Sequence, residues 1–205
     1  HVELAIRIAL ESTVHHRNFA LVQAGARVIP RLTFPNDSVD APADNAPERA
    51  LQEPYSRSPT CWSFPGDQGQ IGIRLSHKIS PTNIVLDVPY KTWTEGLSQA
   101  PRQVVLWGVV DGAANQATYE QDLQAYRNGI AHHGSGPTKS LGYTFLALAI
   151  FEYDATTAFP IQTYRVADPV IDSQMEFGVI VVEVRSNWGG ERTSLCGIRV
   201  HGEVV

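Results

Sequence analysis

The segment Cys61–Ser76 (CWSFPGDQGQIGIRLS) constrains the fold most, because a loop of aromatic residues and glycines runs directly into an alternating strand. From Gln70 onward, short runs rich in β-branched residues recur between Gly, Pro and Asn turns. Such runs indicate an antiparallel β-sandwich and not a βαβ sheet. The expected strands are centred on Ile71–Leu75, Ile84–Val88, Val104–Leu106, Phe145–Ile150, Ile161–Val166, Val179–Val184 and Leu195–Val200.

The composition allows one domain and argues against several classes of partner. A chain of 205 residues with 43% hydrophobic content can bury one substantial core. A net charge of −5 without a run of Lys or Arg argues against binding to nucleic acid or to anionic lipid. No apolar run approaches the ~20 residues that span a bilayer, and no leader pattern opens the chain. Because an initiator Met is also lacking, we expect a fragment of a longer protein whose membrane anchor lies outside it.

Two segments before the strands have different patterns. Residues 1–17 place Val2, Ile6 and Leu10 on one side of an amphipathic helix, which is too short to be stable alone and must pack on the domain or in a coiled coil. Residues 35–50 combine prolines and acidic residues without apolar periodicity, which predicts an extended loop. This loop contains a candidate N-glycosylation site at Asn36.

A third segment, residues 113–141, interrupts the strand pattern. Tyr119, Leu123 and Tyr126 lie four and three residues apart, which predicts one short helix, and a loop follows from His132.

Catalytic and metal-binding patterns are weak. The neighbouring pairs His15-His16 and His132-His133 point to different sides of a helix or a strand, so we interpret them as solvated histidines and leave any metal ligand unknown. The run Gly134–Ser140 imitates a phosphate loop, but its spacing is wrong and no helix pattern follows. No serine lies in a nucleophile elbow. We therefore expect a binding protein and not an enzyme.

The two cysteines, Cys61 and Cys196, are too few for a disulfide-rich scaffold or a four-ligand zinc site. Two buried thiols and one intramolecular bridge both remain open.

Several motifs occur together in a specific order. They are the Cys-Trp-x-Phe-x-Gly-x-x-Gly block at 61–69, Pro-Ile-Gln-Thr at 160–163, Asn-Trp-Gly at 187–189 and Arg-Val-His-Gly at 199–202. With a weaker entry motif at 20–29, the chain resembles the SUN domain over roughly residues 18–205. The resemblance implies an all-β fold, an antiparallel sandwich of the SUN or galactose-binding-like jelly-roll type. It makes residues 1–17 the end of a stalk, 35–50 a lid-like loop and 113–141 an insertion.

The resemblance also implies a function. SUN domains are lumenal parts of inner nuclear membrane proteins, form homotrimers on coiled-coil stalks, and bind the C-terminal tails of KASH proteins in nuclear-envelope bridges called LINC complexes. The tail is held as an added strand under a lid, and its terminal carboxylate enters a pocket. The implied partners are thus a KASH tail and further copies of the chain, with a monomer expected where the stalk is truncated. The alternative is a divergent SUN-like module that binds glycan or another lumenal protein.

The peptide-contacting residues follow from the family pattern. The family's serine before Ala-Pro corresponds to Gln99, next to Ser98. If the chain is aligned from its Arg-Val-His-Gly motif, the family's Tyr-Thr-Cys-x-Tyr falls on residues 192–196, so Arg192 and Cys196 replace the two tyrosines. We therefore expect Ser98, Gln99, Arg192 and Cys196 to contact the peptide.

Other family features are changed or leave no sequence pattern. On the same alignment the family disulfide would join Cys61 to the position of Ser194, so a Cys61–Cys196 bridge requires a shift of register. Thr33 occupies the place of a cysteine that crosslinks the KASH tail, so no covalent tether is expected there. Backbone carbonyls of the loop at 50–60 are the candidate ligands of a monovalent cation, K⁺ or Na⁺, although Tyr55 replaces the family's acidic residue.

Overall fold

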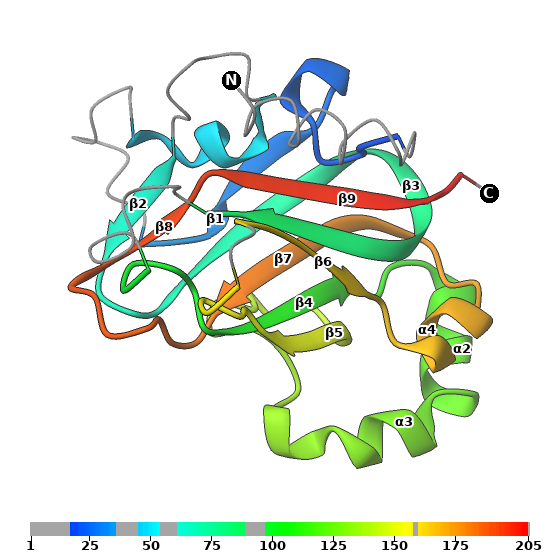
Figure 1. Ribbon diagram of the computed structural model, residues 1–205. Helices are drawn as coiled ribbons and strands as arrows, with labels where there is room; N and C mark the ends of the chain where they lie inside the picture. Colours follow the sequence, from blue (N-terminus) through cyan, green and yellow to red (C-terminus); the bar gives the residue numbers. More distant parts are fainter. Residues whose placement is uncertain (1–16, 36–44, 54–60, 89–96, 158–159, 205) are drawn as a thin grey trace.

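The computed structural model describes residues 17–35, 45–53, 61–88, 97–157 and 160–204 (Figure 1). The expected N-terminal helix, the sequon at Asn36, Tyr55 and most of the lid-like loop lie outside these residues. The described elements are η1 (Val22–Ala24), β1 (Arg27–Phe34), η3 (Pro47–Leu51), β2 (Trp62–Pro65), β3 (Gly69–Asp87), β4 (Gln103–Val109), α2 (Ala113–Gln121), α3 (Gln124–Gly129), η4 (Ala131–His133), β5 (Phe145–Glu152), β6 (Ile161–Arg165), α4 (Asp168–Asp172), β7 (Phe177–Val184), β8 (Arg192–Leu195) and β9 (Gly197–Glu203).

The predicted antiparallel β-sandwich is confirmed. One sheet has the strand order β1-β3-β7-β4-β5, and the far half of β3 pairs with β6 on one side and β9 on the other. β2 and β8 form a separate two-stranded ribbon. The main core lies between the layers and is filled by aliphatic and aromatic side chains, including Trp62, Phe64 and Phe177.

Two of the expected strands are the two ends of one strand. The runs around Ile73 and Leu86 both belong to β3, which crosses from one sheet to the other. The pairing register shifts between Arg74 and Ile79, and again between Pro81 and Asn83. Such irregularities allow a strand to bend and change sheets without ending, which is why the turn-like residues between the two runs do not break it.

β4 is buried on both faces. Val104 and Leu106 belong to the main core, whereas Val105 and Trp107 belong to a second apolar cluster on the outer face of the five-stranded sheet. A strand with two apolar faces needs a cover on each side. Ile130 packs against the second cluster, so the insertion at 113–141 supplies part of that cover.

The insertion contains two short helices where one was expected. In Figure 1, α2 and α3 lie on the side of β4 and β5 that faces away from β9. The predicted Tyr119 and Leu123 are buried, and Tyr126 packs against the main core, so the apolar spacing located the buried side correctly. α2 ends at Gln121, and Leu123 precedes α3 with non-helical backbone angles.

A buried carboxylate fastens the end of the insertion to β7. Glu183 Oε1 accepts hydrogen bonds from the main-chain nitrogen and Oγ1 of Thr138, both at 2.9 Å. Its Oε2 accepts from Trp107 Nε1 at 2.9 Å and from Arg185 Nε at 3.0 Å. Arg185 Nη2 also donates to the carbonyl of His133 at 2.7 Å. Burial lowers the pKa of His133, and the neighbouring His132 and Arg185 lower it further.

A tyrosine fastens the insertion to β5. Tyr126 Oη donates to the carbonyl of Ala147 at 2.8 Å, and burial raises the pKa of Tyr126 to about 12. We expect Tyr126→Phe to lower the free energy of unfolding by about 1 kcal/mol, because the carbonyl loses its partner while the ring keeps its packing. Urea unfolding measures this change. An alkaline absorbance titration should also show a smaller change near pH 12, where Tyr164 still contributes, and unchanged stability would contradict the assigned bond.

Candidate functional site

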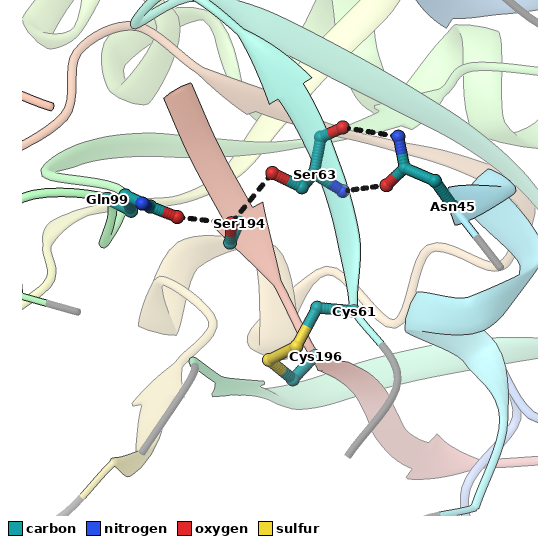
Figure 2. The surroundings of a disulfide bond; sticks show 6 residues. All are labelled: Asn45, Cys61, Ser63, Gln99, Ser194 and Cys196. Carbon is teal, nitrogen blue, oxygen red and sulfur yellow. Dashed lines mark hydrogen bonds between the residues drawn. A yellow bond between two sulfur atoms is a disulfide. The ribbon is translucent and has the colours of Figure 1, made fainter. Parts of the chain in front are cut away.

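The two cysteines are joined where the β2–β8 ribbon begins. The sulfur atoms of Cys61 and Cys196 are bonded at 1.98 Å, and Cys196 is 5% exposed (Figure 2). In the ribbon, Trp62 pairs with Leu195 and Ser63 with Ser194, so the bridge continues the same register. Cys196 is therefore a bridge residue and not a peptide-contacting side chain, which corrects the expectation for this position.

The bridge changes the alignment with the family motif. When the family's cysteine is placed on Cys196, its first tyrosine falls on Ser194 and its second on Ile198, which is 1% exposed in the core. Arg192 then precedes the motif by two residues. The alignment from the Arg-Val-His-Gly motif therefore placed this segment two residues out of register, because this chain is shorter between the cysteine and that motif.

A chain of polar contacts crosses the ribbon from Arg192 to Gln99. Arg192 donates from Nε to Ser63 Oγ at 3.2 Å and from Nη2 to the Ser63 carbonyl at 2.9 Å. Ser194 Oγ lies 2.9 Å from Ser63 Oγ and 3.1 Å from Gln99 Oε1. Figure 2 shows Gln99, Ser194 and Ser63 in a row across the two strands.

The direction of these bonds follows from the donors. Gln99 Oε1 can only accept, so the single proton of Ser194 Oγ goes to it, and Ser63 Oγ, which accepts from Arg192 Nε, donates its own proton to Ser194 Oγ. Gln99 Nε2 then has no hydrogen-bond partner among the described residues. The chain of bonds thus orients the Gln99 carboxamide and leaves its two N–H groups available to an acceptor.

Main-chain hydrogen bonds place Ser98 and Gln99, two of the residues expected to contact the peptide, beside β8. The carbonyl of Ser98 accepts from Gly190 N, and the carbonyl of Gln99 accepts from Ser194 N, each at 2.9 Å. Asn187 Nδ2 holds the turn before β8 by donating to the carbonyls of Gly190 and Arg192. The structure therefore brings Ser98 and Gln99 close to Arg192, which is far from them in the sequence.

Asn45, in the lid-like loop, belongs to no motif and was not predicted as a site residue. Its Nδ2 donates to the Ser63 carbonyl and its Oδ1 accepts from Ser63 N, both at 2.7 Å (Figure 2). The carboxamide thus binds β2 as a residue of a neighbouring strand would. No local pattern identifies such a contact, because it depends on two segments that meet only in the fold.

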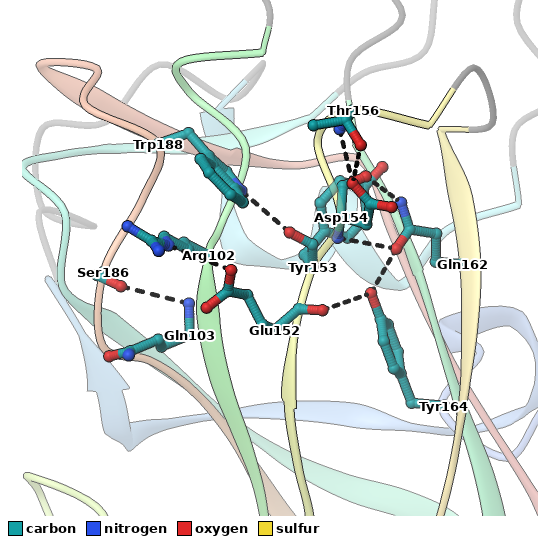
Figure 3. A network of polar contacts seen from close by, with 10 residues as sticks. All are labelled: Arg102, Gln103, Glu152, Tyr153, Asp154, Thr156, Gln162, Tyr164, Ser186 and Trp188. Atoms are coloured by element: carbon teal, nitrogen blue, oxygen red, sulfur yellow. Dashed lines mark hydrogen bonds and ion pairs between the residues drawn. The ribbon is translucent and has the colours of Figure 1, made fainter.

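A second polar network borders the same loops (Figure 3). The Arg102 guanidinium lies 4.5 Å from the centre of the Trp188 ring, and its Nε is 3.4 Å from Glu152 Oε1. Trp188 Nε1 donates to the Tyr153 carbonyl at 3.0 Å. Trp188 is partly buried and packs at the edge of the core.

The network continues onto β6. Gln162 donates from Nε2 to the Asp154 carbonyl at 2.6 Å and accepts at Oε1 from Asp154 N and Tyr164 Oη. Burial raises the pKa of Tyr164 to about 12, and hydrogen bonds from Thr156 lower the pKa of Asp154. These contacts fix the loop between β5 and β6 against β6.

Within the described ranges, no three His, Cys, Asp or Glu side chains gather closely enough to hold a metal ion. Most of the loop expected to bind a monovalent cation lies outside those ranges. None of the helices described above is long and apolar enough to cross a bilayer.

Comparison with known proteins identifies relatives in sequence. The family model "Sad1 / UNC-like C-terminal" matches residues 41–128. The chain is 28% identical over 159 residues to human sperm-associated antigen 4 protein, covering 76% of this chain and 29% of that protein. It is 26% identical over 162 residues to human SUN domain-containing protein 5, covering 78% and 34% respectively. The chain therefore spans about a third of the length of these relatives.

Comparison with solved structures concerns the fold alone. A family 32 carbohydrate-binding module from Streptococcus pneumoniae EndoD matches with a TM-score of 0.57 and 14% identity, covering 91% of this chain and all of the module. The lectin domain of lectinolysin, solved with Lewis B antigen, matches with a TM-score of 0.53 and 11% identity, covering 93% of this chain and all of that domain. Both are galactose-binding-like sandwiches.

Proposed function

We infer that the chain is a divergent member of the SUN-domain family, and we propose that it binds the C-terminal tail of a KASH protein in a nuclear-envelope bridge. The observation that carries this proposal is the oriented carboxamide of Gln99. Its free N–H groups lie at the family's position for a residue of the carboxylate pocket, beside the Ser98–Gly190 contact. A peptide carboxylate is the acceptor that such donors favour.

Arg192 adds positive charge to this site. Its Nε and Nη2 hold Ser63, whereas its Nη1 has no partner among the described residues. The side chain is exposed and therefore accessible to a ligand. The polar groups that this site offers to a ligand are therefore the Arg192 guanidinium and the Gln99 amide.

The proposal extends to the setting of the domain. We place it in the perinuclear lumen, carried by an inner nuclear membrane protein, and assembled as a homotrimer where its stalk is present. N-glycosylation at Asn36 and a monovalent cation in the loop at 50–60 remain predictions for the same setting.

Tail peptides with a free and an amidated C-terminus test the proposal. We expect amidation to weaken binding about tenfold or more, because charge-assisted hydrogen bonds contribute about 1.5–3 kcal/mol each. Isothermal titration calorimetry at one salt concentration measures both affinities. Equal affinity for the two tails, or no binding of either, would remove the carboxylate site.

A further inference from the structure

Ser63 and Ser194 are paired in the β2–β8 ribbon, and the main chain at both residues points away from the ribbon. The main-chain nitrogen of Ser194 donates to the Gln99 carbonyl. On the opposite side, the main-chain nitrogen of Ser63 donates to Asn45 Oδ1. Side chains approach closely in an antiparallel pair whose residues exchange no main-chain hydrogen bond. This explains why the two hydroxyl oxygens lie only 2.9 Å apart.

Asn45 fixes the main chain of Ser63 on both sides of its Cα atom (Figure 2). Its Oδ1 accepts from Ser63 N and its Nδ2 donates to the Ser63 carbonyl, both at 2.7 Å. The N–H and the C=O belong to different peptide units, each of which is planar. A single carboxamide therefore holds two peptide planes, and with them the direction in which the Ser63 side chain points.

Ser63 in turn fixes the guanidinium of Arg192. The Ser63 carbonyl accepts from Nη2 at 2.9 Å, and Oγ accepts from Nε at 3.2 Å. Because the guanidinium is planar and rigid, two contacts to neighbouring nitrogens define its orientation. The carbonyl oxygen accepts from both Asn45 and Arg192, which uses its two lone pairs. Nη1, which has no partner among the described residues, is the nitrogen that remains for a ligand.

Ser63 also acts on Gln99, through Ser194. Ser63 Oγ donates to Ser194 Oγ, which donates to Gln99 Oε1 at 3.1 Å. Ser194 is 3% exposed, so its hydroxyl is shielded from water that would replace these partners. Arg192 Nη1 and the Gln99 amide therefore both depend on Ser63, and Ser63 is held by Asn45.

Asn45 is not needed to fasten its own segment to the domain. The helix η3, which begins two residues later, buries Pro47, Ala50 and Leu51. Ala50 and Leu51 belong to the main core. Removal of the Asn45 carboxamide should therefore leave this segment in place and change the contacts of Ser63.

We propose that Asn45 and Ser63 are positioning residues for recognition of the tail's terminal carboxylate. They set the orientation of Arg192 and Gln99 and do not contact the tail themselves. This inference rests on the proposed function, because the carboxylate is the group that Arg192 and Gln99 bind. It adds that the preference for a free C-terminus, and not the affinity for the rest of the tail, depends on the Asn45 carboxamide.

Asn45→Ala removes the carboxamide and is tested with tail peptides that differ only in a free or an amidated C-terminus. We expect the free tail to bind about tenfold more weakly than it binds the wild type, because Arg192 and Gln99 lose their fixed orientation. The amidated tail lacks the charge that these groups recognise, so its affinity should change by less than about threefold. A purely structural role for Asn45 would weaken both tails equally. Isothermal titration calorimetry measures the four affinities.

A double-mutant cycle with Gln99→Ala shows whether Asn45 acts through the site. Gln99→Ala removes the amide, so part of what Asn45 positions is already lost. We expect the double variant to bind the free tail at least about threefold more tightly than the product of the two single losses predicts. Fully multiplicative losses would mean that the two residues act independently, and the inference would be wrong.

Further variants separate loss of positioning from loss of folding or a change of charge. Asn45→Asp keeps the acceptor for Ser63 N but places a second oxygen against the Ser63 carbonyl, so it should also weaken the free tail more than the amidated one. Gln68→Ala and Gln68→Glu are the matched controls at an exposed residue of the turn between β2 and β3, and neither should alter an affinity by more than about threefold. Circular dichroism and urea unfolding verify that each variant is folded, and Asn45→Asp serves as the test if Asn45→Ala does not fold.

The outcomes separate this inference from the proposed function. If the wild type prefers the free tail and folded Asn45→Ala keeps that preference in full, Asn45 has no positioning role and the proposed function stands. If the wild type binds both tails equally, the proposed function is wrong and the inference falls with it. NMR provides a readout without a tail, because the carboxamide N–H signals of Gln99, identified by their absence in Gln99→Ala, should shift in Asn45→Ala and not in Gln68→Ala. Unshifted signals would contradict the proposed orientation of Gln99 by Asn45.

Discussion

Gln99→Glu is expected to weaken binding of a free-carboxylate tail about 100-fold, or about 2.7 kcal/mol. The substituted side chain can still accept the proton of Ser194, so the chain of bonds from Arg192 is kept. The two N–H donors, however, become a carboxylate oxygen. The change replaces an attraction to the tail's terminal charge by a repulsion, and it alters neither size nor shape.

An amidated tail and a distant glutamate provide the controls. The amidated tail lacks the terminal charge, so its already weak affinity should change much less with Gln99→Glu. Gln103→Glu introduces the same charge at an exposed position four residues along and should change affinity by less than about threefold. If both tails lose affinity equally in Gln99→Glu, or if Gln103→Glu has the same effect, Gln99 does not contact the terminus. Fluorescence anisotropy with labelled tails measures all four combinations.

Glu183→Ala is expected to lower the free energy of unfolding by about 3–5 kcal/mol. The variant leaves the indole N–H of Trp107, which is 1% exposed, and the main-chain N–H of Thr138 without their acceptor. It also removes the partner of Arg185 Nε. Guanidinium unfolding measures the change, and hydrogen exchange should show loss of protection around Thr138.

Glu191→Ala removes the same charge from an exposed position in the turn before β8 and should change stability by less than about 0.5 kcal/mol. A loss below about 1 kcal/mol for Glu183→Ala would mean that other contacts hold the insertion to the sheet. Tyr126 and Gln70 are the alternatives, since Gln70 binds both the N–H and the carbonyl of Lys139.

The strands were predictable because their apolar residues alternate within a few positions of one another. The runs at Ile71–Leu75 and Phe145–Ile150 lie within β3 and β5. The continuity of β3 was not predictable, since pairing with β7 and β9 maintains the strand through residues that favour turns. The second apolar cluster was also missed, because burial of both faces of β4 depends on where the insertion packs.

Of the candidate site, only the residues that lie in or beside short family motifs could be predicted. The family position before Ala-Pro pointed to Gln99, whose side chain lies in the same row of polar contacts as Arg192, and peptide binding by either residue stays a prediction. The alignment of the family motif near Cys196 was wrong by two residues, because no feature of the sequence marks where this chain is two residues shorter. The disulfide bond to Cys61 shows which cysteine belongs to the motif. The Asn45 side chain pairs with the main chain of Ser63, 18 positions further on. A single contact of this kind leaves no periodic pattern in the sequence.

The bond between Cys61 and Cys196 turns most of the chain into a covalent ring, since the two residues are 135 positions apart. The exposed loops around Gly112 and Gly134 lie inside this ring. A protease that cuts once in either loop therefore opens the ring without releasing a fragment, and the pieces separate on a gel only after reduction. Damage to the insertion would leave β2 and β8 tethered to one another.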